Sequence, residues 1–176
     1  MALISNGTSI VSGGGLASGI GGKVIQVQYA QFNGAYSFDG DWHNTALSDS
    51  ITPTSSSNKI IIQMFLGRVA HHGNNSMMFR LRRGTTLINV GTQIDSRQRV
   101  TGALMRVTDD TNHTQGMLGM TFIDAPSTTS ATTYTLQARK EGGGSWYLNR
   151  SQNFQNTSNE YGGVGSSFMY LMEVAI

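Results

Sequence analysis

The sequence predicts an all-β protein, an antiparallel β-sandwich that is jelly-roll-like and carries an extended Gly-rich N-terminal arm. From residue 23 onward, short apolar or alternating runs are separated by clusters of Gly, Asn, Ser and Asp, the pattern of strands and turns. No stretch of ten residues or more has a convincing helical period. The 176 residues suffice for one domain with a real core. An immunoglobulin-like sandwich is the second candidate topology.

Residues 1–22 form a segment distinct from the rest, without charge and rich in glycine. Such a chain is flexible in solution and cannot build its own core. Its large aliphatic residues are spaced along the segment and predict an anchoring arm that becomes ordered on assembly. They are Leu3, Ile4, Ile10, Val11, Leu16 and Ile20. The alternative is a flexible N-terminal segment that anchors nothing. We therefore expect two parts, an arm at 1–22 and a single β-sandwich domain at 23–176.

The first strands follow directly from alternation. In KVIQVQYAQF, residues Ile25, Val27 and Tyr29 share one face, and the glutamines between them share the other, as a half-buried strand requires. Residues 45–51 alternate less cleanly, and ITPTSSSNK is a turn because of its proline and serines.

The middle of the chain contributes the central strands. Residues 59–69 are apolar on both faces, which is typical of a central strand. The run MMFRLRR alternates Met77, Phe79 and Leu81 against a second face that carries arginines. TTLINVG, QRVTGALMRVT and QGMLGMTFID are three further strands.

The last strands follow the turn around Pro126. In YTLQARKE, alternate residues Tyr134, Leu136 and Ala138 share a face, and SWYLNR is a short strand. In SSFMYLMEVA, four residues face one way: Phe168, Tyr170, Met172 and Val174. Each strand has one apolar face to bury, so about nine or ten strands predict two packed antiparallel sheets.

Composition excludes several classes of function. The absence of cysteine removes disulfides, zinc-thiolate sites, iron–sulfur clusters and cysteine nucleophiles. The formal net charge is +2, and Lys and Arg are too few to predict a nucleic-acid-binding face. The start lacks the basic and apolar regions of a secretory signal. No apolar run approaches about 18 residues, so we expect no membrane insertion.

No constellation of residues predicts catalysis, a metal or a cofactor. Asp39 with Asp41 and Asp109 with Asp110 lie in expected loops, where aspartate is a turn residue. The adjacent His71 and His72 would point to opposite faces of a strand, although in a loop they could share an ion with His43 or His113. A nucleophilic G-x-S-x-G element is absent. We therefore expect no enzyme activity and no cofactor.

Two groups of residues are candidates for contacts with partners. The first is the basic group of Arg80, Arg82, Arg83, Arg97, Arg99 and Arg106. It predicts either a solvated sheet face or an interface in which Arg80, Arg82, Arg97 and Arg99 pair with carboxylates of a neighbour. The second is the aromatic trio of Trp42, Trp146 and Tyr147, which would either plug the ends of the sandwich or stack on sugars.

Four segments together resemble the small β-sandwich virion proteins of tailed bacteriophages, especially those of cyanobacterial and aquatic hosts. The segments are GKVIQVQYAQF, LSDSITPTSSSNKIIIQMFLGRV, MMFRLRRGTTLI and SSFMYLMEVA. They share an opening K-V-hydrophobic strand, an ITP-(S/T)-S-(S/T)-(S/N)-K-I turn, an R-G-T turn and an L-M-E-hydrophobic ending. The resemblance covers residues 23–176 and rests on fold and turn signatures, without a shared chemical motif.

This resemblance implies a non-enzymatic virion component. In that family the domain occurs in capsid decoration proteins and in tail-fibre tips, usually as a homotrimer. A fibre needs an elongated shaft, whereas this chain has only an arm before the sandwich. We therefore expect a decoration (cement) protein on the head surface that binds the major capsid protein. The alternative is a short tail fibre or receptor-binding tip that joins a tail or baseplate adaptor and recognises a host surface glycan.

Overall fold

A computed structural model describes residues 3–5, 8–12, 15–16, 23–39, 41–71, 76–104, 115–140, 145–153, 156–158 and 162–175. This described part is all-β and contains no helix, which confirms the predicted fold class. Its strands are β1 (Leu3–Ser5), β2 (Thr8–Ser12), β3 (Gly15–Leu16), β4 (Lys23–Phe32), β5 (Tyr36–Phe38), β6 (His43–Ile51), β7 (Lys59–His71), β8 (Met77–Arg83), β9 (Thr86–Ile88), β10 (Gly102–Leu104), β11 (Gln115–Asp124), β12 (Thr132–Lys140), β13 (Trp146–Leu148) and β14 (Ser167–Ala175).

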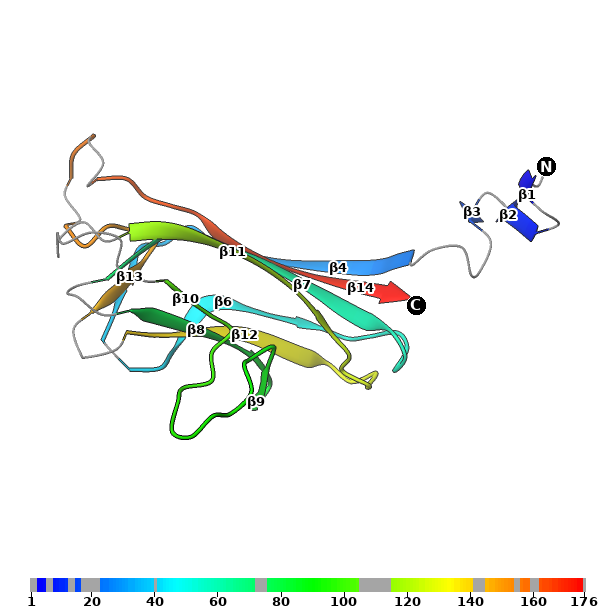
Figure 1. The fold of residues 1–176 in the computed structure, drawn as a ribbon. Helices are drawn as coiled ribbons and strands as arrows, with labels where there is room; N and C mark the ends of the chain where they lie inside the picture. Colours follow the sequence, from blue (N-terminus) through cyan, green and yellow to red (C-terminus); the bar gives the residue numbers. More distant parts are fainter. Residues whose placement is uncertain are drawn as a thin grey trace.

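Two antiparallel sheets pack face to face (Figure 1). In the larger sheet, β4, β14, β7 and β11 lie side by side, and the short β13 and β5 extend it beyond the end of β14. The smaller sheet has the order β10-β8-β12-β6, with β9 paired to β8. The four adjacent strands β4-β14-β7-β11 of one sheet and β6-β12-β8-β10 of the other have the strand order of a jelly roll. The predicted topology is therefore confirmed over the immunoglobulin-like alternative.

The core lies between the two sheets and contains the apolar faces predicted for three strands. Met77, Phe79 and Leu81 of β8 are fully buried, as are the alternate residues Tyr134, Leu136 and Ala138 of β12. The central strand β7 contributes Ile60, Ile62, Met64 and Leu66 to the same core and pairs on both of its edges.

The orientation of strand β4 is the reverse of the predicted one: its apolar face, which we expected to be buried, points outward. Gln26 and Gln28 point toward the interior, whereas Val27 and Tyr29 are 49% and 46% exposed on the outer surface. The neighbouring β14 behaves similarly: Met169 and Leu171 fill the core, and its predicted apolar stripe faces outward. That prediction was wrong because a buried carboxylate in β14 requires polar partners on the inner face of β4.

Glu173 of β14 is this carboxylate, and its side chain is fully buried. Its Oε1 accepts hydrogen bonds from the Thr54 backbone N–H (2.7 Å), the Thr54 hydroxyl (2.8 Å) and Asn58 Nδ2 (2.6 Å). Its Oε2 accepts one from Gln26 Nε2 (2.7 Å), which also donates to the Thr52 carbonyl (2.7 Å). Glu173 therefore joins β14 to β4 and to the predicted turn at residues 52–58.

These hydrogen bonds decide the protonation of Glu173. Burial alone would raise the pKa of this carboxyl, but the donors on Asn58, Gln26 and Thr54 outweigh it and lower the pKa to about 2. A group with a lowered pKa stabilises the fold above its ordinary pKa, and the stabilisation disappears as the pH falls through the lowered value.

A second carboxylate ties the two sheets together at β11. Asp124 accepts hydrogen bonds from Arg83 Nη1 (2.9 and 3.0 Å) and from the Tyr134 hydroxyl (2.7 Å). Burial and the bond to Asp124 raise the pKa of the Tyr134 phenol.

At Gly67 of β7 the neighbouring strand on one edge changes. Strand β14 pairs with β7 before this residue, and β13 pairs with the same edge after it. A Cβ at Gly67 would lie 2.1 Å from the Ser166 carbonyl oxygen, so only glycine fits this close approach. The buried Asn149 holds the crossing, because its Nδ2 donates to the Phe32 carbonyl (2.7 Å) and its Oδ1 accepts from the Ser167 hydroxyl (2.6 Å). Its φ of 59° is one that asparagine tolerates.

Within the predicted arm, the described backbone of β1, β2 and β3 pairs as a small antiparallel sheet. Figure 1 shows this sheet standing beyond the start of β4, away from the sandwich. The side chains of the arm residues proposed for anchoring lie outside the described part of the structure, as does Ile20.

Glu173→Gln should destabilise the fold and remove its main acid dependence. We expect the free energy of unfolding of the natural chain to fall by about 3 kcal/mol as the pH drops from about 5 to about 2. In the variant, the amide would direct N–H groups at donors of Thr54 or Asn58, which costs about 2–4 kcal/mol at neutral pH. Urea unfolding measured across this pH range checks both statements. Equal pH dependence in the two proteins would contradict this role of Glu173.

Candidate functional site

The outer face of the larger sheet is the strongest candidate for a functional surface. Cross-strand partners point to the same side of a sheet, so the pairing of β4, β14, β7 and β11 places their outward residues in continuous rows. We call this surface the apolar face. It consists of Val27, Tyr29, Gln31, Ile61, Gln63, Phe65, Met117, Gly119, Thr121, Ile123, Phe168, Tyr170 and Met172.

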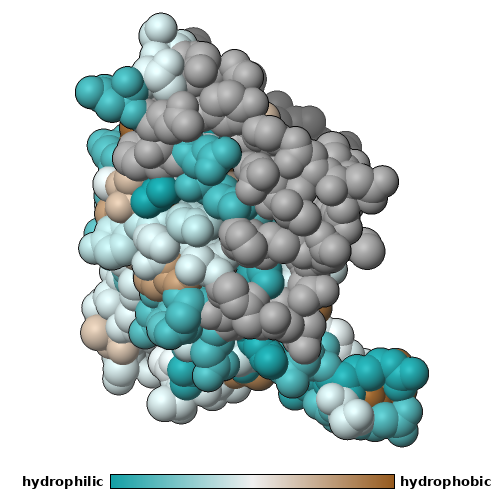
Figure 2. All heavy atoms as spheres, turned by 90° about the vertical axis from the view of Figure 1, so that its left-hand side faces the viewer, coloured by the Kyte–Doolittle hydropathy of each residue, from teal (hydrophilic) through white to brown (hydrophobic). Residues whose placement is uncertain are grey.

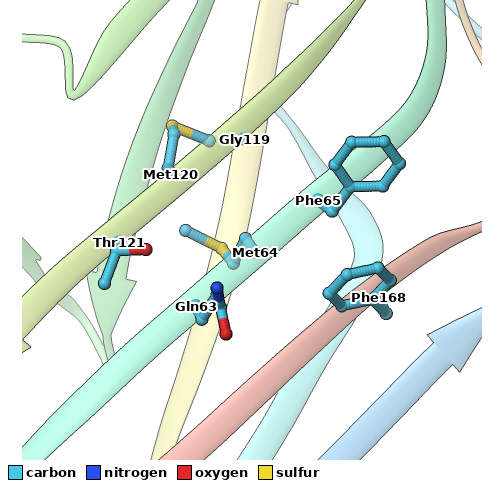
Figure 3. Close-up of a pocket in the computed structure, with 7 residues that line it drawn as sticks. All are labelled: Gln63, Met64, Phe65, Gly119, Met120, Thr121 and Phe168. Carbon is cyan, nitrogen blue, oxygen red and sulfur yellow. The ribbon is translucent and has the colours of Figure 1, made fainter.

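Aromatic rings cross the middle of the apolar face. The ring centroids of Tyr29 and Tyr170 lie 4.6 Å apart, those of Tyr170 and Phe168 5.4 Å, and those of Phe168 and Phe65 5.4 Å. Figure 3 shows the last two rings side by side on neighbouring strands. Gly119 has no side chain, so a shallow hollow lined by Phe65, Phe168 and Thr121 opens beside them.

The edges of the apolar face are the most exposed. Met117 and Ile123 of β11 are 69% and 64% exposed, and Val27 and Tyr29 of β4 are about half exposed on the opposite edge. The polar members of the face, Gln31, Gln63 and Thr121, carry no charge. Figure 2 looks at the loop end of the sandwich, where the coloured residues are mostly teal or near-white with a few brown ones.

The arginines predicted as a possible interface come from one strand and one loop. Arg80 and Arg82 lie on the outer face of the smaller sheet, opposite to the apolar face. Arg97 and Arg99 lie in the exposed β9–β10 loop. There Arg97 Nη1 pairs with Asp95 (2.8 Å), and Arg99 Nε donates to the Gly91 carbonyl (2.9 Å).

Arg83 pairs with Asp124, as described above, and Arg106 lies outside the described residues.

Each of the three aromatic candidates has its own packing partner. Trp146 is fully buried and stacks on Phe38 at 4.1 Å between ring centroids, so its ring presents no face to a sugar. Trp42 is half-buried, and the Arg80 guanidinium lies 4.0 Å from its ring centroid. Tyr147 is also half-buried and lies under Arg150 at 4.9 Å.

The histidines and paired carboxylates have structural roles where the structure describes them. Asp39 accepts hydrogen bonds from His43 and from the Asp41 backbone N–H, the turn geometry expected of aspartate. The bond from His43 and that backbone bond lower the pKa of Asp39. His71 is buried in β7.

His72, His113, Asp109 and Asp110 lie outside the described residues. Within the described ranges, no three His, Cys, Asp or Glu side chains come together as a metal site.

The apolar face has a signal in the sequence that strand alternation alone does not reveal. Glu173 lies on the same face of β14 as Leu171 and Met169, because the three residues alternate along the strand. This face therefore combines two large apolar side chains with one charged side chain. Alternation gives no sign of which side is buried. The opposing glutamines of β4 are the residues that could satisfy a buried carboxylate, and they identify the inner face.

Comparison with known proteins gives no family: no protein-family model and no curated protein matches this chain. The described part of the chain contains no helix that is long and apolar enough to cross a bilayer.

Proposed function

We propose that this protein is a non-enzymatic structural component of a phage virion, a homotrimeric capsid decoration protein that stabilises the head. The apolar face carries this proposal. Monomeric proteins rarely expose a contiguous apolar patch of this kind, and such a patch marks a protein–protein contact. The resemblance of the sequence to small β-sandwich virion proteins is the basis for placing the protein in a virion and for proposing three subunits.

A second copy of the chain is the occupant that the apolar face fits best. Its rows contain aromatic and aliphatic side chains with uncharged polar residues between them, so two such faces meet without like-charge repulsion. Around a threefold axis, the Tyr29 side of one face would approach the Ile123 side of the next. Closed symmetry of this kind leaves no apolar face open.

The fold is compatible with this role. Jelly rolls occur in viral capsid domains and also in lectins, and fold alone does not fix function. What supports assembly in this chain is the placement of apolar side chains on the outside of a well-packed sandwich.

The N-terminal arm supplies the attachment to the capsid in this proposal. Its aliphatic residues, Leu3, Ile4, Ile10, Val11, Leu16 and Ile20, would bind between neighbouring copies of the major capsid protein. Three arms on one trimer bind together, so individually weak contacts give a high combined affinity.

The double variant Val27→Lys with Ile123→Lys should convert the trimer to a monomer without unfolding it. Both positions are exposed in the single chain, so the substitutions cost little in its own core. Across an interface they would bury unpaired charges. Light scattering coupled to size exclusion gives the mass of each protein. Ala46→Lys, at an exposed position of β6, is the matched control and should stay trimeric. A double variant that keeps the mass of the natural protein would refute the assignment of the interface.

Deletion of residues 2–20 should leave a folded trimer that no longer binds capsids. The first strand of the sandwich, β4, begins after this segment, at Lys23. Co-sedimentation with undecorated capsids measures binding, and light scattering measures the trimer. Full decoration by the truncated protein would show that the arm is not the anchor.

The position of the protein on the particle tests the function most directly. We expect antibody labelling of virions to mark the head in many copies. Labelling of the tail would instead establish the alternative of a short fibre or receptor-binding tip, joined to a tail or baseplate adaptor. That outcome would direct attention to glycan contacts near Trp42 and Tyr147.

A further inference from the structure

A positioned arginine stands on the outer face of the smaller sheet. Asn44 of β6, Gln137 of β12 and Arg80 of β8 lie in one cross-strand row. Gln137 Nε2 donates to Asn44 Oδ1 (2.7 Å), and Gln137 Oε1 accepts from Arg80 Nε (2.7 Å). Gln137 is itself buried, so this relay fixes the Arg80 side chain at its Nε atom.

Trp42 fixes the same guanidinium from one side. The Arg80 Cζ atom lies 4.0 Å from the centroid of the Trp42 ring, close enough for a cation–π contact. Trp42 immediately precedes β6 and reaches across β12 to β8. The guanidinium is therefore held by two independent contacts, which lowers the entropy cost of binding a ligand.

The hydrogen-bonding capacity of Arg80 is only partly used. A guanidinium has five N–H donors, and its two Nη atoms carry four of them. Among the described residues, only Gln137 accepts from Arg80, and it does so at Nε. The fork of Nη donors therefore has no acceptor among the described residues, and this fork matches the two oxygens of a carboxylate.

Positive charge gathers around this fork. Arg82 lies two residues further along the same face of β8, and Arg139 of β12 lies diagonally opposite to Arg80. Burial, and after it the charges of Arg82 and Arg139, lower the pKa of Arg80, while Asp41 opposes this shift. A partner carboxylate at Arg80 would also be attracted by the charge of Arg82.

The surroundings favour a macromolecular partner over a small molecule. The nearby outward residues of β6 and β12 are short, and their hydroxyls pair with one another: Ser48 with Thr135 and Ser50 with Thr133, each at 2.7 Å. Arginine and tryptophan are the residue types most enriched at protein–protein hot spots, and here they form one contact pair.

We propose that Arg80, held by Trp42 and Gln137, binds a side-chain carboxylate on an acidic segment of a partner protein. This site lies on the sheet opposite to the apolar face, so it does not depend on the proposed trimer or on a place in a virion. It would give the sandwich two surfaces of different chemistry, one apolar and one specific for anions.

Titration of the full chain with a short polyglutamate peptide tests the site. The indole N–H signal of Trp42 in a two-dimensional ¹⁵N NMR spectrum reports binding, and that of the buried Trp146 serves as an internal control. We expect the Trp42 signal to shift and the Trp146 signal to stay. Arg80→Gln should weaken binding by about tenfold or more, because it removes a charge-assisted pair of hydrogen bonds.

Two further variants separate a specific site from general charge. Arg99→Gln removes an equal charge from an exposed loop outside the site and should change the affinity by less than about twofold. Arg80→Lys keeps the charge but loses the planar fork, so it should bind less tightly than the natural protein. It also provides a folded reference if Arg80→Gln does not fold.

Three results would overturn the proposal. An equal loss in Arg99→Gln and Arg80→Gln would mean that binding follows net charge. An unchanged Trp42 signal at the highest peptide concentration would mean that no carboxylate binds there. Tighter binding of polygalacturonate than of polyglutamate, lost in Arg80→Gln, would assign the site to acidic sugars instead of a protein partner.

Discussion

The buried carboxylate of Glu173 is the constraint on which the rest of the structure depends. A charged group without water must be surrounded by donors, and here they come from Thr54 and Asn58 of the 52–58 turn and from Gln26 of β4. Side chains alternate along a strand, so an inward Gln26 requires an outward Val27. One polar requirement inside the sandwich therefore produces an apolar surface outside it. The same contacts join the turn motif and the L-M-E ending, two of the signatures on which the family resemblance rests.

The two outer faces of the sandwich consequently differ in chemistry. The middle of the larger sheet presents uncharged aromatic and aliphatic rows, with Lys59 in the row at one end, and such rows suit contact with identical copies. The smaller sheet presents hydroxyls, amides and the Arg80–Trp42 pair, which suits a polar and acidic partner. A jelly roll provides two such broad faces, and its loops and the N-terminal arm leave from the ends of the sandwich (Figure 1). Two faces of different chemistry would allow a small chain to bind its own copies and another protein at the same time.

Strand alternation in the sequence predicted the strands, the two-sheet packing and the jelly-roll topology, because burial on one face leaves a period of two. It also identified the core faces of β8 and β12, where the other face carries arginine or threonine. It failed at β4, because a period of two does not state which face is inside when the polar residues are neutral glutamines. The sequence did not place the arginines: Arg80 lies on β8 and Arg99 in the β9–β10 loop, and no local pattern contains the path of that loop. The contact of Trp42 with Arg80 likewise joins residues that are distant in sequence.

A structure of the assembled protein at near-atomic resolution tests the central claim most directly, because it shows what covers the larger sheet. The account predicts that Tyr29 and Tyr170 are buried against another copy of the chain, with Met117 and Ile123 in the same interface. It also predicts that Arg80 stays outside this interface. A chain that remains monomeric with these side chains in water, or a trimer formed through the smaller sheet, would contradict it.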